Sequence, residues 1–198
     1  ITKNKTSYET DFWLSKNAKE IEFARNQDIE IDRLVDKMII DKICENRPVI
    51  IESFGGPWLT DMPGLRIWIN SNITSRVYKA KVSFIRGYSE LQYMDSTEIE
   101  KELLRKDEFI RDYFRSEYQV DIFSDFEIFD LIIDTSDLIS SPTIEASNLS
   151  IRHSQKIIST AVNAYIWDFP SLQDEWRSCY HANSDRIRIS PFSKLFVS

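Results

Sequence analysis

The chain has 198 residues, of which 42% are hydrophobic and 29% charged, and its formal net charge is −7. This size and composition are typical of a globular domain with a sizeable core, and no apolar run is long enough to span a membrane. The negative charge argues against nonspecific nucleic-acid binding, although a local basic patch can still bind a phosphate. We therefore expect no membrane and no nucleic-acid partner.

The cysteines and histidines show no metal-ligand spacing. Cys44 and Cys179 are far apart, and His153 and His181 lie apart from both. This pattern favours a reduced, cytoplasmic chain with no metal site built from soft ligands. No positively charged segment followed by an apolar stretch opens the sequence, so we expect no secretory signal.

The first third of the chain predicts helices and one strand. Spacings of three and four between apolar residues predict an amphipathic helix over Glu30–Cys44, and a weaker pattern indicates a helix within residues 13–23. Pro48–Ile51 is short and β-branched, which favours a buried strand. We expect Ser53–Pro57 to form a loop after this strand.

The remaining elements alternate in the same way. Further strands are predicted at Leu65–Ile69 and Phe129–Ile133, and strands alternating with helices are typical of a parallel sheet. Ser71 or Asn72 caps a helix reaching about residue 84. The next helix begins in the Asp95–Thr97 cluster, with a capping box from Thr97 to Glu100. A last helix is predicted over residues 150–167, and we expect Pro170 to close the compact part, leaving a polar tail of unassigned role.

Six segments within residues 20–140 carry a resemblance to a known family. They are Glu30-Ile-Asp32 with Asp36, Val49–Glu52, Leu65–Ile69 leading to Arg76, Arg105-Lys-Asp107 with Arg111 and Arg115, Tyr118–Ile122, and Phe129–Ser136. In order and separation they resemble the cytidylate kinase family of P-loop nucleoside-monophosphate kinases.

The resemblance implies an α/β fold. This would be a three-layer parallel sheet of P-loop kinase type, with helices on both faces and a helical lid at about residues 85–117. Residues 1–150 would form the nucleotide kinase-like core, and residues 151–198 a C-terminal helix and a polar, aromatic tail. By resemblance, the cofactors are ATP and Mg²⁺, and the activity is phosphoryl transfer to CMP, dCMP or a related small acceptor.

The same resemblance implies site residues. Positive charge around the transferring phosphoryl group supplies much of the acceleration in such reactions. The residues implied to act on the phosphates are Arg76, Arg105, Lys106, Arg111 and Arg115. Those implied to bind nucleotide are Lys5, Thr6, Asp32, Asp36 and Glu52.

Blander interpretations of these charges stay open. Charges that alternate along a helix usually form a solvated surface held by pairs four residues apart, as Glu102–Lys106 and Asp107–Arg111 would be. Acidic residues at an exposed helix start interact favourably with the helix dipole, and this explains Glu30, Asp32 and Asp36 without a ligand. Asp134, which follows a strand, is equally typical of a helix cap or a turn.

Two features depart from the family pattern. The sequence lacks the glycine-rich loop that ends in Gly-Lys-Ser/Thr, and Lys5-Thr6-Ser7 resembles only its last residues. In related kinases the strand feeding that loop lies in the middle of the sheet. We therefore expect that either another segment, such as the tail, fills this place or further residues precede Ile1. Ser53 and Phe54 stand where the family has Gly-Arg, and phenylalanine cannot make a bidentate phosphate contact.

Three functions follow as hypotheses. The leading one is a nucleotide kinase-like enzyme. The second is a non-catalytic relative that serves as a binding or assembly module and holds a protein partner through its terminal extensions. Aromatic residues in or near these extensions favour the second, although they would equally pack within the chain: Trp13, Trp167, Trp176 and Tyr180. The third, suggested by Phe54, is a kinase acting on a specialised metabolite.

Overall fold

The structure is a computed structural model that describes residues 30–45, 49–53, 55–85 and 94–195. The chain divides into two compact units, Ile1–Met62 and Pro63–Ser198. The helix predicted within residues 13–23 lies outside the described residues.

The first unit contains the helix α3 (Glu30–Cys44), which confirms the predicted bounds. Its one buried polar residue among those with described side chains is Asp36. The strand predicted at Pro48–Ile51 is wrong for its described part, because Val49–Ile51 adopts neither helix nor strand. Ile50 is 94% exposed, so its side chain lacks the packing that a buried strand requires.

A short helix, α4 (Gly56–Leu59), occupies part of the predicted loop Ser53–Pro57. The Ser53 hydroxyl accepts a hydrogen bond from the Gly56 N–H at 3.0 Å. Pro57 lies in the first turn of the helix, where its missing N–H leaves no hydrogen bond unmade. The expected loop therefore ends at Gly55.

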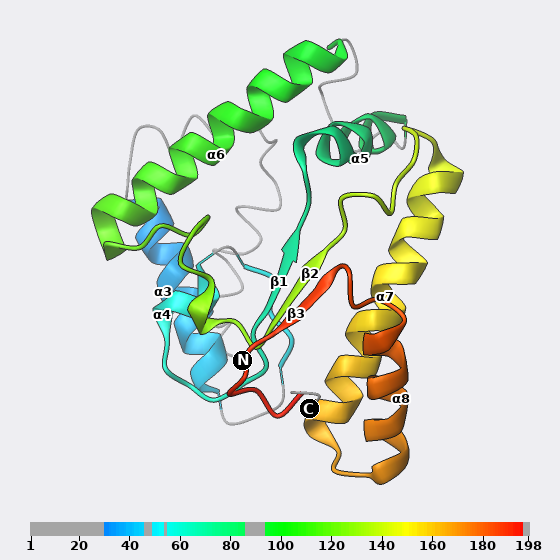
Figure 1. Ribbon diagram of the computed structural model, residues 1–198. Helices are drawn as coiled ribbons and strands as arrows, with labels where there is room; N and C mark the ends of the chain where they lie inside the picture. The colour runs from blue at the N-terminus through cyan, green and yellow to red at the C-terminus, as the bar shows by residue number, and fades with distance from the viewer. Residues whose placement is uncertain (1–29, 46–48, 54, 86–93, 196–198) are drawn as a thin grey trace, which may run out of the picture. The chain divides into compact units, whose positions relative to one another are not determined.

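The second unit is organised around a sheet of three strands in the order β1-β2-β3 (Figure 1). β1 (Ile67–Asn70) and β2 (Leu131–Asp134) are parallel, as expected, and both begin two residues later than predicted. β3 (Ile187–Ile189) runs antiparallel to β2 and comes from the tail. The tail therefore forms an edge of this sheet and does not lie in its middle.

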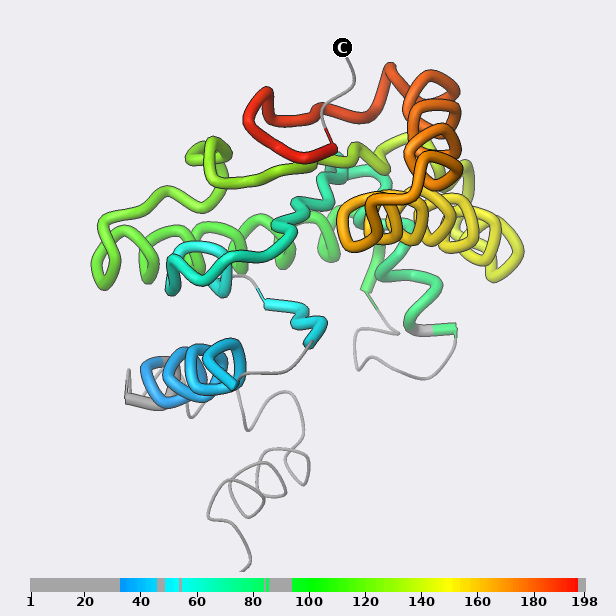
Figure 2. The backbone as a smooth tube through the Cα atoms, turned by 90° about the horizontal axis from the view of Figure 1, so that it is seen from below, coloured from blue at the N-terminus to red at the C-terminus, as the bar shows by residue number. Residues whose placement is uncertain are grey.

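One face of the sheet packs on the helices α7 (Ile144–Ile166) and α8 (Pro170–His181), which lie side by side (Figure 2). Leu131 and Ile133 of β2 point to this face and are completely buried. Trp176 of α8 joins the same core, and its indole N–H donates to the Leu195 carbonyl at 2.8 Å. The predicted domain boundary at residue 150 falls within α7.

The opposite face of the sheet is aromatic. Trp68 of β1 alternates with the residues that face α7, and its ring lies 5.3 Å from Phe126 and 5.4 Å from Phe129 between centroids. Phe126 belongs to the 3-10 helix η1 (Phe126–Ile128) that leads into β2. Side chains close to β2 in the sequence therefore cover this face.

Among its described residues the unit has two further helices, α5 (Ile73–Ile85) and α6 (Ser96–Tyr118), and they pack against each other. The capping box of α6 joins Asp95 and Glu98, so the predicted pair of Thr97 and Glu100 is wrong. Asp95 has the extended backbone that an N-cap needs, whereas Thr97 already lies inside the helix.

The last two helices differ from the sequence prediction at their starts. α7 starts six residues before the predicted Ser150, because the Thr143 hydroxyl accepts the Ala146 N–H and caps it there. Pro170 begins α8, so the prediction that the compact part ends there is also wrong. A proline in the first turn of a helix leaves no intrahelical hydrogen bond unmade.

Candidate functional site at the strand ends

Polar groups gather where the parallel strands β1 and β2 end. Asn70 and Asp134, the last residues of the two strands, lie opposite each other in the register. Thr135 donates its backbone N–H and its hydroxyl to the Asn70 carbonyl oxygen, each at 2.9 Å. In open α/β sheets, ligands bind outside the carboxyl ends of parallel strands. This edge of the sheet is therefore the candidate site.

Asp134 is kept ionised at this edge. Its carboxylate accepts hydrogen bonds from the Asn70 amide at 3.1 Å and from the Ser136 backbone N–H at 2.8 Å. Burial acts to raise the pKa of Asp134, but bonds from Ser136 and Asn70 and the charge of Arg186 outweigh it and lower the pKa. The bond to Ser136 closes a turn, so the interpretation of Asp134 as a turn residue is confirmed.

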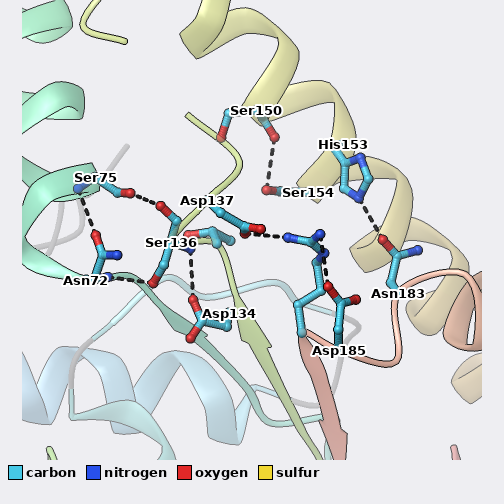
Figure 3. Close-up of polar contacts among 12 residues, drawn as sticks. Asn72, Ser75, Asp134, Ser136, Asp137, Ser150, His153, Ser154, Asn183 and Asp185 are labelled. Atoms are coloured by element: carbon cyan, nitrogen blue, oxygen red, sulfur yellow. Dashed lines mark hydrogen bonds and ion pairs between the residues drawn. The ribbon is translucent and has the colours of Figure 1, made fainter. Parts of the chain in front are cut away.

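The start of α5 is fastened to the turn after β2 (Figure 3). The Asn72 side chain caps the helix by accepting the Ser75 N–H at 2.9 Å, which confirms Asn72 as the cap. The Asn72 backbone N–H donates to the Ser136 hydroxyl at 2.8 Å, and the Ser75 hydroxyl donates to the Ser136 carbonyl. These bonds fix the first turn of α5 beside the strand ends.

Lys79 reaches back from the second turn of α5 to this edge. Its ammonium donates to the hydroxyls of Ser71 at 3.0 Å and Thr135 at 2.9 Å. Burial lowers the pKa of Lys79, and the charge of Arg76 lowers it further, whereas Asp134 acts in the opposite direction. Lys79 is thus a half-buried cation whose direct partners are two uncharged hydroxyls.

Arg76, the residue implied first by the resemblance, forms an ion pair. Its two terminal nitrogens donate to the two carboxylate oxygens of Asp107 in α6, at 2.5 and 2.7 Å. The side chains are only 29% and 18% exposed. Arg76 therefore lies in the first turn of α5 with its guanidinium turned to α6. The predicted pairing of Asp107 with Arg111 is wrong, because Asp107 binds Arg76 instead.

The other implied basic residues lie on α6 and pair with nearby carboxylates. Arg105 and Lys106 both bind Glu102, at 2.9 and 3.6 Å, which confirms the Glu102–Lys106 pair. Hydrogen bonding from Arg105 is the main cause that lowers the pKa of Glu102. Arg105 and Lys106 are about half exposed, as a solvated helix surface requires.

The C-terminal part of α6 carries the other two basic residues implied by the resemblance, Arg111 and Arg115. Arg111 and Arg115 lie 3.5 and 2.6 Å from the carboxylate of Asp121. The Arg111 guanidinium also lies over the Phe123 ring, 5.0 Å from its centroid. Burial acts to raise the pKa of Asp121, but hydrogen bonds from Phe123, Arg115 and Ser124 and the charge of Arg115 lower it.

The residues implied to bind nucleotide belong to the first unit. Asp32 and Asp36 lie on α3, and Asp36 is buried. Glu52 is exposed in the segment before α4. Lys5 and Thr6 lie outside the described residues. Their role in nucleotide binding stays a prediction.

The tail also contributes to the strand ends, which sequence reasoning missed. The Asp134 N–H donates to the Arg186 carbonyl at 2.8 Å. The Arg186 side chain forms ion pairs with Asp137 and, at 3.2 Å, with Asp185 (Figure 3). No periodic pattern surrounds Arg186 in the sequence, so only the folded chain reveals it. Lys79 had a usable signal, because residues three apart on a helix share a face and Arg76 is three before it.

A magnesium ion that is bound together with nucleotide phosphates needs few protein ligands. Among the described residues, no group of three or more His, Cys, Asp and Glu side chains could hold a metal ion. Mg²⁺ bound with nucleotide phosphates commonly takes one or two carboxylates, and Asp134 is an ionised carboxylate at this edge. Separately, no described helix is both long enough and apolar enough to cross a membrane.

Comparison with known proteins shows a distant similarity to a kinase. A cytidylate kinase of Sulfurisphaera tokodaii is 25% identical over 120 residues, which cover 60% of this chain and 62% of that protein. The chain thus spans less than two thirds of that relative and resembles it distantly. No family model and no solved structure matches the chain.

Proposed function

We propose that this protein is a nucleotide kinase-like phosphotransferase. It would transfer a phosphoryl group from ATP to a nucleoside monophosphate of the CMP or dCMP type, or to a related small acceptor. The observation that supports it most is the position of Lys79 on α5, whose ammonium contacts Thr135 at the carboxyl ends of two parallel strands, with Arg76 three residues before it on the same helix. The distant likeness to a cytidylate kinase points the same way.

The chemistry suits these groups. Phosphoryl transfer depends on positioning the reactants and on stabilising negative charge on the transferring group. A guanidinium binds two phosphate oxygens through its planar fork, and an ammonium acts as a compact positive charge. In this proposal Arg76 and Lys79 bind the phosphates, and Asp134 serves the Mg²⁺ that the nucleotide brings with it.

The proposal includes the implied fold. The second unit would be part of a three-layer α/β sheet of P-loop kinase type, and α6 would act as the helical lid. Arg105, Lys106, Arg111 and Arg115 would then have to exchange Glu102 and Asp121 for phosphate oxygens. Exposed ion pairs of this kind are weak, about 0.2–1 kcal/mol each, so a bound phosphate can compete for them.

A second candidate is a kinase-like subunit without catalysis, acting as a binding or assembly module. The stacked rings of Trp167 and Phe169 favour it, because they are 54% and 58% exposed between α7 and α8. Exposed aromatic residues are enriched where proteins bind one another.

Thermal unfolding with and without millimolar Mg·ATP tests the proposal. A ligand that binds only the folded state raises the unfolding midpoint, by an amount set by its concentration relative to Kd. The proposal expects a rise in the wild-type chain and a much smaller rise in Arg76→Ala. If Mg·ATP does not raise the unfolding midpoint of the wild type, and mass spectrometry verifies the full chain, the proposal of a phosphotransferase is refuted. A rise that survives in Arg76→Ala would refute the assigned residue.

A further inference from the structure

Arg76 and Asp107 form a contact that an incoming oxyanion would have to compete with. Both terminal guanidinium nitrogens of Arg76 are held by both oxygens of Asp107, at 2.5 and 2.7 Å. A phosphate group uses the same two nitrogens when it binds arginine in the bidentate manner. The two modes therefore exclude each other.

The pair is placed so that it can exchange. The side chains retain 29% and 18% exposure, so water reaches the pair. The helices that carry it have a second link, because the Lys81 ammonium donates to the Ser96 hydroxyl at 2.5 Å. Losing the Arg76–Asp107 contact would therefore leave α5 and α6 joined.

Lys79 offers a first point of attraction for an anion. Its direct partners are the hydroxyls of Ser71 and Thr135, and within the part of the chain that the structure describes no carboxylate contacts it directly. Arg76 lies three residues before Lys79 on α5, so the two residues share a face of the helix. For Arg76 to bind the same oxyanion through both terminal nitrogens, its contact with Asp107 must break.

We infer that Asp107 is an internal competitor for the phosphate site. In the structure Asp107 occupies the bidentate face of Arg76. A bound phosphate group displaces Asp107 and loosens α6 from α5. This inference rests on the proposed phosphate site and adds a regulatory contact to it. An opposite role, in which Asp107 orients Arg76 toward the ligand, predicts the reverse effect when Asp107 is changed.

Calorimetric titration with pyrophosphate separates these roles in the full chain. Asp107→Asn keeps the side-chain shape and removes the charge, and we expect it to lower Kd by about two- to fivefold, which corresponds to the loss of one partly exposed ion pair. Arg76→Gln should raise Kd. In the double variant Asp107→Asn, Arg76→Gln, the gain should vanish, because Asp107 acts through Arg76. Ser96→Ala, which removes the other link between the helices, should leave Kd unchanged.

Each outcome decides a different point. If the wild type does not bind pyrophosphate, the proposed phosphate site fails, and this inference fails with it. If the wild type binds but Asp107→Asn binds equally or more weakly, only the competition is wrong. A gain that persists in the double variant would mean that Asp107 acts through general charge repulsion, which also contradicts the inference.

Hydrogen exchange in the wild type keeps the test open if Asp107→Asn does not fold. With pyrophosphate bound, amides of α6 near Asp107 should exchange faster, because the helix has lost one of its links to α5. Amides at the start of α5 should exchange more slowly. Slower exchange in both helices would overturn the inference.

Discussion

The Lys79 ammonium lies 2.9 Å from the Thr135 hydroxyl, and this bond joins the second turn of α5 to the residue that follows β2. The same hydroxyl donates to the Asn70 carbonyl at the end of β1. One lysine thus contacts the point where two parallel strands end. Because both hydrogen-bond partners of Lys79 are uncharged hydroxyls, its positive charge can attract an anionic ligand.

Lys79 should leave a signature in the pH dependence of stability. Burial lowers its folded-state pKa below the ordinary 10.5, so the unfolded chain binds the proton more tightly. Lys79 therefore reduces stability at neutral pH, and this reduction fades as the pH rises through the folded-state pKa toward 10.5. Urea unfolding should show that the wild type gains stability relative to Lys79→Met over this range. A difference that does not change with pH would contradict the prediction.

Asp134 should act in the opposite range of pH. Its folded-state pKa lies below the ordinary 3.8, so its stabilising contribution is present above 3.8 and is lost as the pH falls through the folded-state pKa. We expect Asp134→Asn to lose about 1 kcal/mol of stability at neutral pH, the net value of one typical hydrogen bond. Chemical denaturation at pH values from neutral down through the acid range should show the difference shrinking. If Asp134→Asn is less stable than the wild type by the same amount at every pH, the loss comes from packing and not from the charge of Asp134.

The N-terminus of α6 offers a matched pair of variants. Asp95 accepts the Glu98 N–H, and Glu98 accepts the Asp95 N–H in return. Replacing an N-cap residue by alanine costs about 0.5–2 kcal/mol, so Asp95→Ala should lower the free energy of unfolding by that amount. Thr97→Ala, inside the same helix, should have little effect. The opposite ranking, measured by thermal unfolding, would restore the capping box predicted at Thr97.

The tail should prove to be a structural part of the second unit. Trp176 is 1% exposed and donates to the Leu195 carbonyl, whereas Trp167 is 54% exposed. Replacing a buried tryptophan by alanine costs about 3–5 kcal/mol, so Trp176→Ala should lower the free energy of unfolding by about that amount. Trp167→Ala should cost less than about 1 kcal/mol. Comparable losses in denaturant titrations would contradict the described packing.

The sequence predicted elements with strong local patterns. The apolar residues of α3 recur every three or four positions, so its bounds Glu30–Cys44 were predictable. The β-branched runs at β1 and β2 were found as well. Val49–Ile51 has the same composition but no strand structure, because a strand exists only with a neighbour to pair with, and periodicity does not report neighbours.

The site was predictable only in part. The resemblance named Arg76, whose role in a site stays a prediction, and the capping signal named Asn72, which the structure confirms as the cap of α5. The ion pair with Asp107 joins residues 31 positions apart, and the contact of Lys79 with Thr135 spans 56. Such contacts are set by the packing of α5 and by the register of β1 with β2. Local sequence patterns contain neither.

The most direct test of the account is the binding of Mg·ATP to matched lysine variants of α5. Lys79 contacts the strand ends, whereas Lys81 on the same helix binds Ser96. Isothermal titration should show that Lys79→Met weakens binding at least about tenfold, as the loss of a charged contact to phosphate predicts. Lys81→Met should bind like the wild type. Equal affinities in all three proteins would contradict a phosphate site at the ends of β1 and β2.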